Sequence, residues 1–191
     1  MGFLDTLLGR TRLPKSSEEN LFAMTTAAVG LQAAAGITPA GRVGVVFKRL
    51  PPGRFDQLRS DMVGLLSLQG ADAGLKVEDR TDDLGFEWLI LDGADFQNAV
   101  AAVHSAATSL LEEGLGDLLL AVAFKFTEGS PARPVYWIYG FKTGTFYPFV
   151  PSAARQRDNA EELRLAALAK PEGLPVEPQL ERWYALWGIS V

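Results

Sequence analysis

The stretch from Leu118 to Phe126 constrains the fold more than any other part of the chain, because almost all of its residues are apolar. The stretch is far shorter than the roughly 18 apolar residues that a membrane-spanning helix requires. Its apolar residues do not alternate with polar ones, which indicates a strand that is buried on both faces. We therefore expect this stretch to be the central strand of a sheet.

Apolar residues elsewhere follow the period of a strand or of a helix. We expect strands at residues 43–49, 75–80, 86–91, 118–126, 135–142 and 145–150 and helices at residues 18–35, 55–67, 96–113 and 155–170. A hairpin and a three-strand meander dominate this order, whereas an α/β protein alternates strands and helices regularly. The sequence therefore predicts an α+β fold, with an antiparallel sheet of about five or six strands covered mainly on one face by helices.

A chain of 191 residues is long enough for one domain with a self-sufficient core. Residues 1–17 form an N-terminal amphipathic segment and linker in this interpretation, and residues 18–191 form a single α+β domain. Three prolines after position 170, together with Gly173, indicate an extended C-terminal arm at residues 171–191.

Composition excludes several classes of function. The chain contains no Cys and one His, which rules out cysteine-ligated zinc, thiol nucleophiles, iron–sulfur clusters and two-His metal sites. A net charge of −5 does not favour a broad electrostatic contact with nucleic acid or anionic lipid. We expect no metal and no cofactor.

Two local patterns could carry chemistry, and we interpret both as structural. His104 lies in the middle of an expected helix, and its spacing points to neither an orienting carboxylate nor a nucleophile. Asp79, Asp82 and Asp83 surround the hairpin turn without the ligand order of a calcium loop, so a solvated turn is the simpler interpretation. We therefore expect no catalytic residues.

The most unusual part of the chain is the aromatic run from Tyr136 to Phe149. Aromatic residues occupy both alternating positions here, so some of them must face away from the helix-covered core. Either the C-terminal arm covers them with Trp183 and Trp187, or they line a binding groove. The groove alternative places a small-molecule site between sheet and arm, with Tyr139, Tyr147, Trp183 and Glu177 around it.

Two further segments leave alternatives open. Arg157, Asp158 and Asn159 stand at the charged start of the last helix, where they are either a solvated face with local ion pairs or a docking surface for a partner. Apolar residues at 3–8 recur at helical spacing, so this segment either docks on its own domain or contacts a partner or a membrane surface.

Several blocks of sequence resemble the PspAB family of proteins associated with phage shock protein A in actinobacteria and archaea. The blocks are Met-Gly-Phe-Leu-Asp-Thr-Leu-Leu-Gly-Arg at 1–10, Leu-Phe-Ala at 21–23, Ala-Ala-Val-Gly-Leu-Gln-Ala at 27–33, Gly-Thr-Phe-Tyr-Pro-Phe at 144–149, Arg-Asp-Asn at 157–159, Leu-Pro-Val-Glu-Pro at 174–178 and Arg-Trp-Tyr-Ala-Leu-Trp-Gly at 182–188. The resemblance extends over nearly the whole chain.

The resemblance implies a cytoplasmic, non-enzymatic accessory protein of the envelope-stress response. Its implied partner is phage shock protein A or a membrane-bound zinc protease, and no catalytic residue carries over. The candidate interaction surface that we expect comprises Lys142, Thr145, Tyr147, Arg157, Asp158, Asn159, Trp183 and Trp187. The alternatives are a small-molecule binder or an enzyme with its pocket between sheet and arm, and a peripheral membrane contact through residues 3–8.

Overall fold

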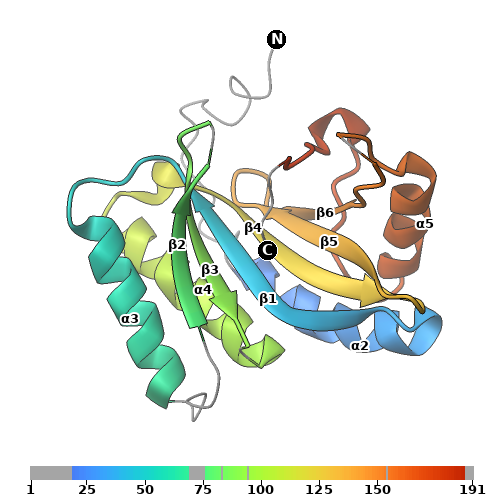
Figure 1. Ribbon diagram of the computed structural model, residues 1–191, viewed down its shortest axis with the longest axis horizontal. Coiled ribbons are helices and arrows are strands. Elements are labelled where there is room, and N and C mark those ends of the chain that lie inside the picture. The colour runs from blue at the N-terminus through green and yellow to red at the C-terminus, as the bar shows by residue number, and fades with distance from the viewer. Residues whose placement is uncertain (1–18, 69–75, 83, 94, 154, 188–191) are drawn as a thin grey trace.

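The computed structural model describes residues 19–68, 76–82, 84–93, 95–153 and 155–187 (Figure 1). Within these residues the strands are β1 Thr38–Phe47, β2 Lys76–Thr81, β3 Glu87–Asp92, β4 Leu119–Glu128, β5 Arg133–Gly140 and β6 Thr145–Phe149. They form one antiparallel sheet in the order β2-β3-β1-β4-β5-β6. The predicted α+β fold is confirmed, and the apolar stretch that begins at Leu118 becomes the interior strand β4.

Helices cover one face of this sheet. The helices are α2 Ala23–Ala35, α3 Arg54–Leu68, α4 Phe96–Glu112 and α5 Asn159–Ala169, with short 3-10 turns η1 Glu19–Phe22, η2 Gly116–Leu118 and η3 Leu180–Arg182. Figure 1 shows α2 and α4 behind the sheet and α3 beside it, packed against α4, whereas α5 stands beside β6. The carboxylate of Asp95 accepts hydrogen bonds from the backbone N–H groups of Gln97 and Asn98 and so caps α4.

The sheet separates two apolar cores. The larger core lies under the helices and contains the side chains of Phe124, Trp137 and Tyr139, none of which is exposed. The smaller core lies on the other face, where Trp88, Ile138 and Tyr147 meet Trp183 of the C-terminal arm. The arm therefore covers part of the face that the helices leave open.

A register shift separates the pairs Phe47–Leu119 and Val46–Ala121 between β1 and β4. The extra residue in β4, Leu120, packs with Ala121 in the smaller core, so the apolar run does not alternate strictly at this point. The bulge therefore presents two successive apolar residues to the face that the helices leave open.

Two element boundaries differ from those expected. Strand β1 begins at Thr38 instead of residue 43, because Thr38 and Pro39 already pair with β4. A second register shift, around Gly41 with its φ of 68°, separates these pairs from the pairing that resumes at Val43. Helix α5 begins at Asn159 instead of residue 155, because the preceding residues turn back on themselves. Arg155 has a positive φ, and the N–H of Asp158 donates to the carbonyl of Val150.

Residues 1–17, which we interpret as an amphipathic segment and linker, lie outside the described residues. Within the described part, none of the helices combines the length and the apolar character needed to cross a membrane.

Candidate functional site

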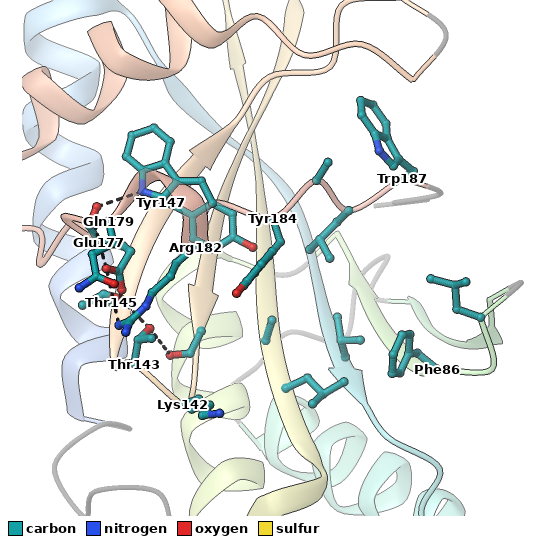
Figure 2. Close-up of a pocket in the computed structure, with 18 of the residues that line it drawn as sticks. Phe86, Lys142, Thr143, Thr145, Tyr147, Glu177, Gln179, Arg182, Tyr184 and Trp187 are labelled. Atoms are coloured by element: carbon teal, nitrogen blue, oxygen red, sulfur yellow. Dashed lines mark hydrogen bonds and ion pairs between the residues drawn. The ribbon is translucent and has the colours of Figure 1, made fainter. Parts of the chain in front are cut away.

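A groove of about 880 Å³ lies on the face of the sheet opposite the helices (Figure 2). The sheet forms its floor, and the C-terminal arm forms one wall with Trp183, Tyr184, Ala185, Leu186 and Trp187. Leu84 and Phe86, from the β2–β3 turn, also line the groove, and Figure 2 shows Phe86 at the end far from Glu177. Most of the lining is apolar, so this groove is the main candidate for a functional site among the described residues.

The floor is a single row of residues that pair from strand to strand. The row runs through Trp88 on β3, Val46 on β1, Ala121 on β4, Gly140 on β5 and Thr145 on β6, and all five line the groove. Ala121 and Gly140 are direct cross-strand partners with the two smallest side chains, so the floor is low in the middle of the row, and the Thr143 hydroxyl lies beside Gly140.

Backbone hydrogen bonds fix the arm along the edge strand β6. The N–H of Phe146 donates to the carbonyl of Pro175, and the N–H of Glu177 donates to the carbonyl of Phe146, each over 2.8 Å. These bonds form a short parallel bridge between Phe146 and Val176. The indole Nε1 of Trp183 then donates to the carbonyl of Glu177 over 2.9 Å, which turns the arm across the sheet.

Aromatic contacts hold the rest of the arm. The rings of Trp183 and Tyr147 are stacked with 6.4 Å between their centroids, and Trp187 meets Phe149 edge to face at 5.3 Å. Burial raises the pKa of the Tyr147 phenol far above its ordinary range, so this side chain stays neutral in the folded protein.

One end of the groove is polar (Figure 2). Glu177 is only 3% exposed, and its carboxylate accepts hydrogen bonds from the Thr145 hydroxyl at 2.9 Å and from the N–H of Gln179 at 3.0 Å. Arg182 forms a longer ion pair with Glu177, at 4.0 Å. Lys142 and Thr143 line the same end.

The opposite end is organised by Asp82. Its carboxylate accepts hydrogen bonds from the backbone N–H groups of Leu84 and Phe86 and from the indole N–H of Trp88, at 2.9, 3.0 and 2.9 Å. Asp82 is therefore more than part of a solvated acidic turn, since it shapes the hairpin that closes the groove. Asp83, part of the same expected cluster, lies outside the described residues.

Arg157 is directed inward and ties the arm to α5. Its Nε lies 2.9 Å from both carboxylate oxygens of Glu162, and its Nη1 donates to the carbonyl of Trp183 over 2.6 Å. Glu162 also accepts from the N–H of Val150 and has a side chain only 2% exposed. The guanidinium lies 5.5 Å from the centre of the Phe149 ring. These contacts link helix, strand and arm.

The structure brings part of the expected surface together. Lys142, Thr145, Tyr147, Trp183 and Trp187 all line the groove. Arg157 contacts the back of its wall through the Trp183 carbonyl, Asp158 caps α5 by accepting from the N–H of Glu161, and Asn159 is exposed on the first turn of that helix. These last three residues do not line the groove.

The expectation that Tyr139 lines a pocket under the arm is wrong. Tyr139 pairs with Phe146 between β5 and β6, and both side chains point into the larger core under the helices. Because side chains alternate along a strand, Tyr139 faces the side opposite to Ile138 and to the groove.

His104, the one histidine of the chain, does not line the groove. His104 lies on α4 with its ring centroid 4.8 Å from that of Phe22, away from the groove. Within the described ranges no three His, Asp or Glu residues gather closely enough to hold a metal ion. The groove itself is lined by hydroxyls, two carboxylates, cations and apolar surface.

Sequence reasoning missed the small residues of the groove floor and the role of Asp82. The available signal for the floor was the alternation of Ala121 and Ala123 with the larger Val122 and Phe124, which places small side chains on one face of β4. The signal for Asp82 was its position at the start of the hairpin turn, where Asp accepts bonds from following backbone N–H groups.

Searches among curated proteins and among solved structures returned no significant match. The family model described as PspA associated protein B matches residues 1–191, the full length of this sequence. The chain therefore belongs to the PspA associated protein B family.

Proposed function

We propose that the protein is a non-enzymatic, cytoplasmic accessory of the envelope-stress, or phage shock, response, and that it docks on a protein partner. The family description supports a link to phage shock protein A, and that protein is the partner we propose first. A membrane-bound zinc protease is the second partner to test.

The observation that carries this proposal is the open groove with exposed apolar side chains on its rim. Leu84 is 67% exposed at one end, and Trp187 is 37% exposed on the arm. Large aromatic and aliphatic side chains of this kind act as anchors in protein interfaces, where a few of them supply most of the binding energy. Asn159, exposed on the first turn of α5, belongs to the expected surface without lining the groove.

Binding of purified phage shock protein A to Leu84→Ala and Trp187→Ala variants tests the proposal. Each variant should weaken binding by about tenfold or more, because each removes an anchor worth about 1.4 kcal/mol or more. Val29→Ala is the matched control, since Val29 is also 67% exposed but lies on α2, on the helix side of the sheet. Equal binding by all three variants would contradict docking at the groove.

Charge reversal at Arg157 is a poor test of docking. Arg157 joins Glu162 to the backbone of Trp183, so its replacement would loosen the arm before any partner is considered. Asn159→Ala probes the same neighbourhood without breaking these contacts.

A second candidate function is the binding of a small molecule in the same groove. The volume of about 880 Å³ supports it, because ligand pockets in proteins measure about 300–1,000 Å³ and combine apolar walls with a few polar groups. Binding of a ligand by the purified protein without any partner would separate the two candidates.

A further inference from the structure

We propose that the groove binds an elongated, single-chain amphiphile with one anionic head group, of the fatty-acid type, whose head lies at the Lys142–Arg182 end. This inference rests on the second candidate function and names its class of ligand.

The shape of the groove favours an elongated ligand. Its floor crosses five adjacent strands, from Trp88 on β3 to Thr145 on β6. Neighbouring strands lie about 4.8 Å apart, so the four intervals give the floor a length of about 19 Å. In the middle of this length, Val46 and Ala121 present no polar side-chain atoms, and the first polar side chain toward β6 is Thr143, whose hydroxyl lies beside Gly140. An aliphatic chain lying across the strands would therefore bury apolar surface from Trp88 to Ala121.

The charges at one end favour an anionic head group. Glu177 is the carboxylate at this end, and Thr145 and Gln179 donate hydrogen bonds to its two oxygens. Arg182 reaches Glu177 only at 4.0 Å, a distance at which the guanidinium keeps N–H donors for another acceptor. Lys142 lines the same end of the groove. A ligand carboxylate placed here gains charge-assisted hydrogen bonds.

The other end sets the direction of the ligand. Asp82 carries a negative charge there, and three donors from the hairpin already bind its carboxylate. An anionic head at this end would be repelled by Asp82, whereas an apolar tail would meet Leu84 and Phe86. The tail therefore points toward the β2–β3 turn and the head toward Lys142.

Three probes with the same chain length test the head-group preference. Sodium dodecanoate, dodecan-1-ol and dodecylammonium chloride are titrated separately into the full-length protein below their micelle thresholds. Calorimetry gives stoichiometry and affinity, and tryptophan fluorescence follows the ring environments of the arm. We expect one dodecanoate per chain, bound about tenfold or more tightly than the alcohol, and dodecylammonium weakest of the three.

Variants locate the site. Lys142→Gln and Arg182→Gln should each reduce dodecanoate affinity severalfold while leaving dodecanol affinity unchanged, and Lys170→Gln, outside the groove, is the matched control. Ala121→Phe fills the floor and should abolish binding of both probes, with circular dichroism to confirm that it folds. If this variant fails to fold, Leu84→Asp, at an exposed position of the tail end, should weaken both probes.

The outcomes test the anionic head group and the small-molecule function separately. Equal affinity for acid and alcohol, or dodecanoate binding unchanged in both glutamine variants, overturns the anionic head group while the small-molecule function stands. Absence of binding by all three probes overturns both the amphiphile and the small-molecule function in this form. Neither result bears on the binding of phage shock protein A, which the Leu84 and Trp187 variants test independently.

Discussion

The indole ring of Trp183 lies almost parallel to the phenol ring of Tyr147, with 18° between their planes. This contact joins the C-terminal arm to β6 and is the point at which the wall of the groove meets its floor. Trp183 is 8% exposed although it belongs to an irregular segment, so packing on the sheet, and not secondary structure, fixes its position. The arm is thereby part of the folded domain.

Replacing Trp183 should show how much of the stability depends on the arm. Trp183→Ala removes the stacked ring and the hydrogen bond to the Glu177 carbonyl, so we expect a loss of about 3 kcal/mol in the free energy of unfolding. Trp183→Phe keeps most of the apolar area and loses the indole N–H, which should cost about 1 kcal/mol. Urea unfolding measures both. Equal stability of the alanine variant and the wild type would show that the arm does not contribute to the core.

Replacing Arg157 alone should reduce the free energy of unfolding more than replacing both Arg157 and its partner Glu162. Arg157→Met leaves the Glu162 carboxylate buried with the N–H of Val150 as its remaining donor among the contacts described, and we expect a loss of about 3 kcal/mol or more. The double variant Arg157→Met, Glu162→Met removes the buried charge and should recover part of this loss. A double-mutant cycle by chemical denaturation measures the coupling. Strictly additive losses would argue against the internal tie.

Asp82 should stabilise the β2–β3 hairpin specifically. Asp82→Ala leaves two backbone N–H groups and the Trp88 indole without their acceptor, so hydrogen exchange in the hairpin should become faster and stability should fall by about 1–3 kcal/mol. Asp79→Ala is the control, because Asp79 forms an ion pair with Arg59 in which both side chains are about half exposed. Identical exchange rates in the two variants would contradict an organising role for Asp82.

The ion pairs around Glu161 predict loss of stability in acid. A hydrogen bond from the Arg164 guanidinium lowers the pKa of Glu161 below its ordinary value, and Arg133 adds to the effect. Because this pKa is lower in the folded than in the unfolded state, ionised Glu161 stabilises the folded protein. The stabilisation is complete above the unfolded-state pKa of about 4.3 and is lost as the pH falls through the folded-state pKa. Glu161→Gln should therefore reduce stability at pH 6 more than at pH 3.

Urea midpoints between pH 3 and pH 7 measure this difference. Glu181→Gln, at an exposed position on η3, serves as the control and should follow the wild-type pH profile. A Glu161→Gln profile parallel to that of the wild type would remove Glu161 from the account of acid unfolding.

The sheet could be predicted from the sequence because its signals are local. The apolar run in β4 and the hairpin turn before Gly85 each act within a few residues, and the α+β fold followed from their order. The cap at Asp95 is a local feature of the same kind, since an Asp before an amphipathic helix accepts bonds from the first turn. Boundaries failed at Thr38 and Asn159, where a register shift and a reversed turn depend on contacts with distant residues.

The site was only half predictable for the same reason. The aromatic content of residues 136–149 and of the arm indicated a second packed face, and five of the eight candidate residues line the groove. The inward direction of Arg157 was hidden, because its partners are a helix residue and a backbone carbonyl 26 positions away. A charged residue at a helix start is usually solvated, and only the folded arm changes that.

The pairing of residues 175–177 with Phe146 also limits how another chain can bind. A peptide often joins a sheet as an added strand along an exposed edge, where it uses the free backbone groups of the edge strand. On β6 the N–H and the carbonyl of Phe146 already bond to Pro175 and Glu177. A peptide that added there would have to displace the segment that holds the wall of the groove. Strand addition at this edge and an intact groove therefore exclude each other.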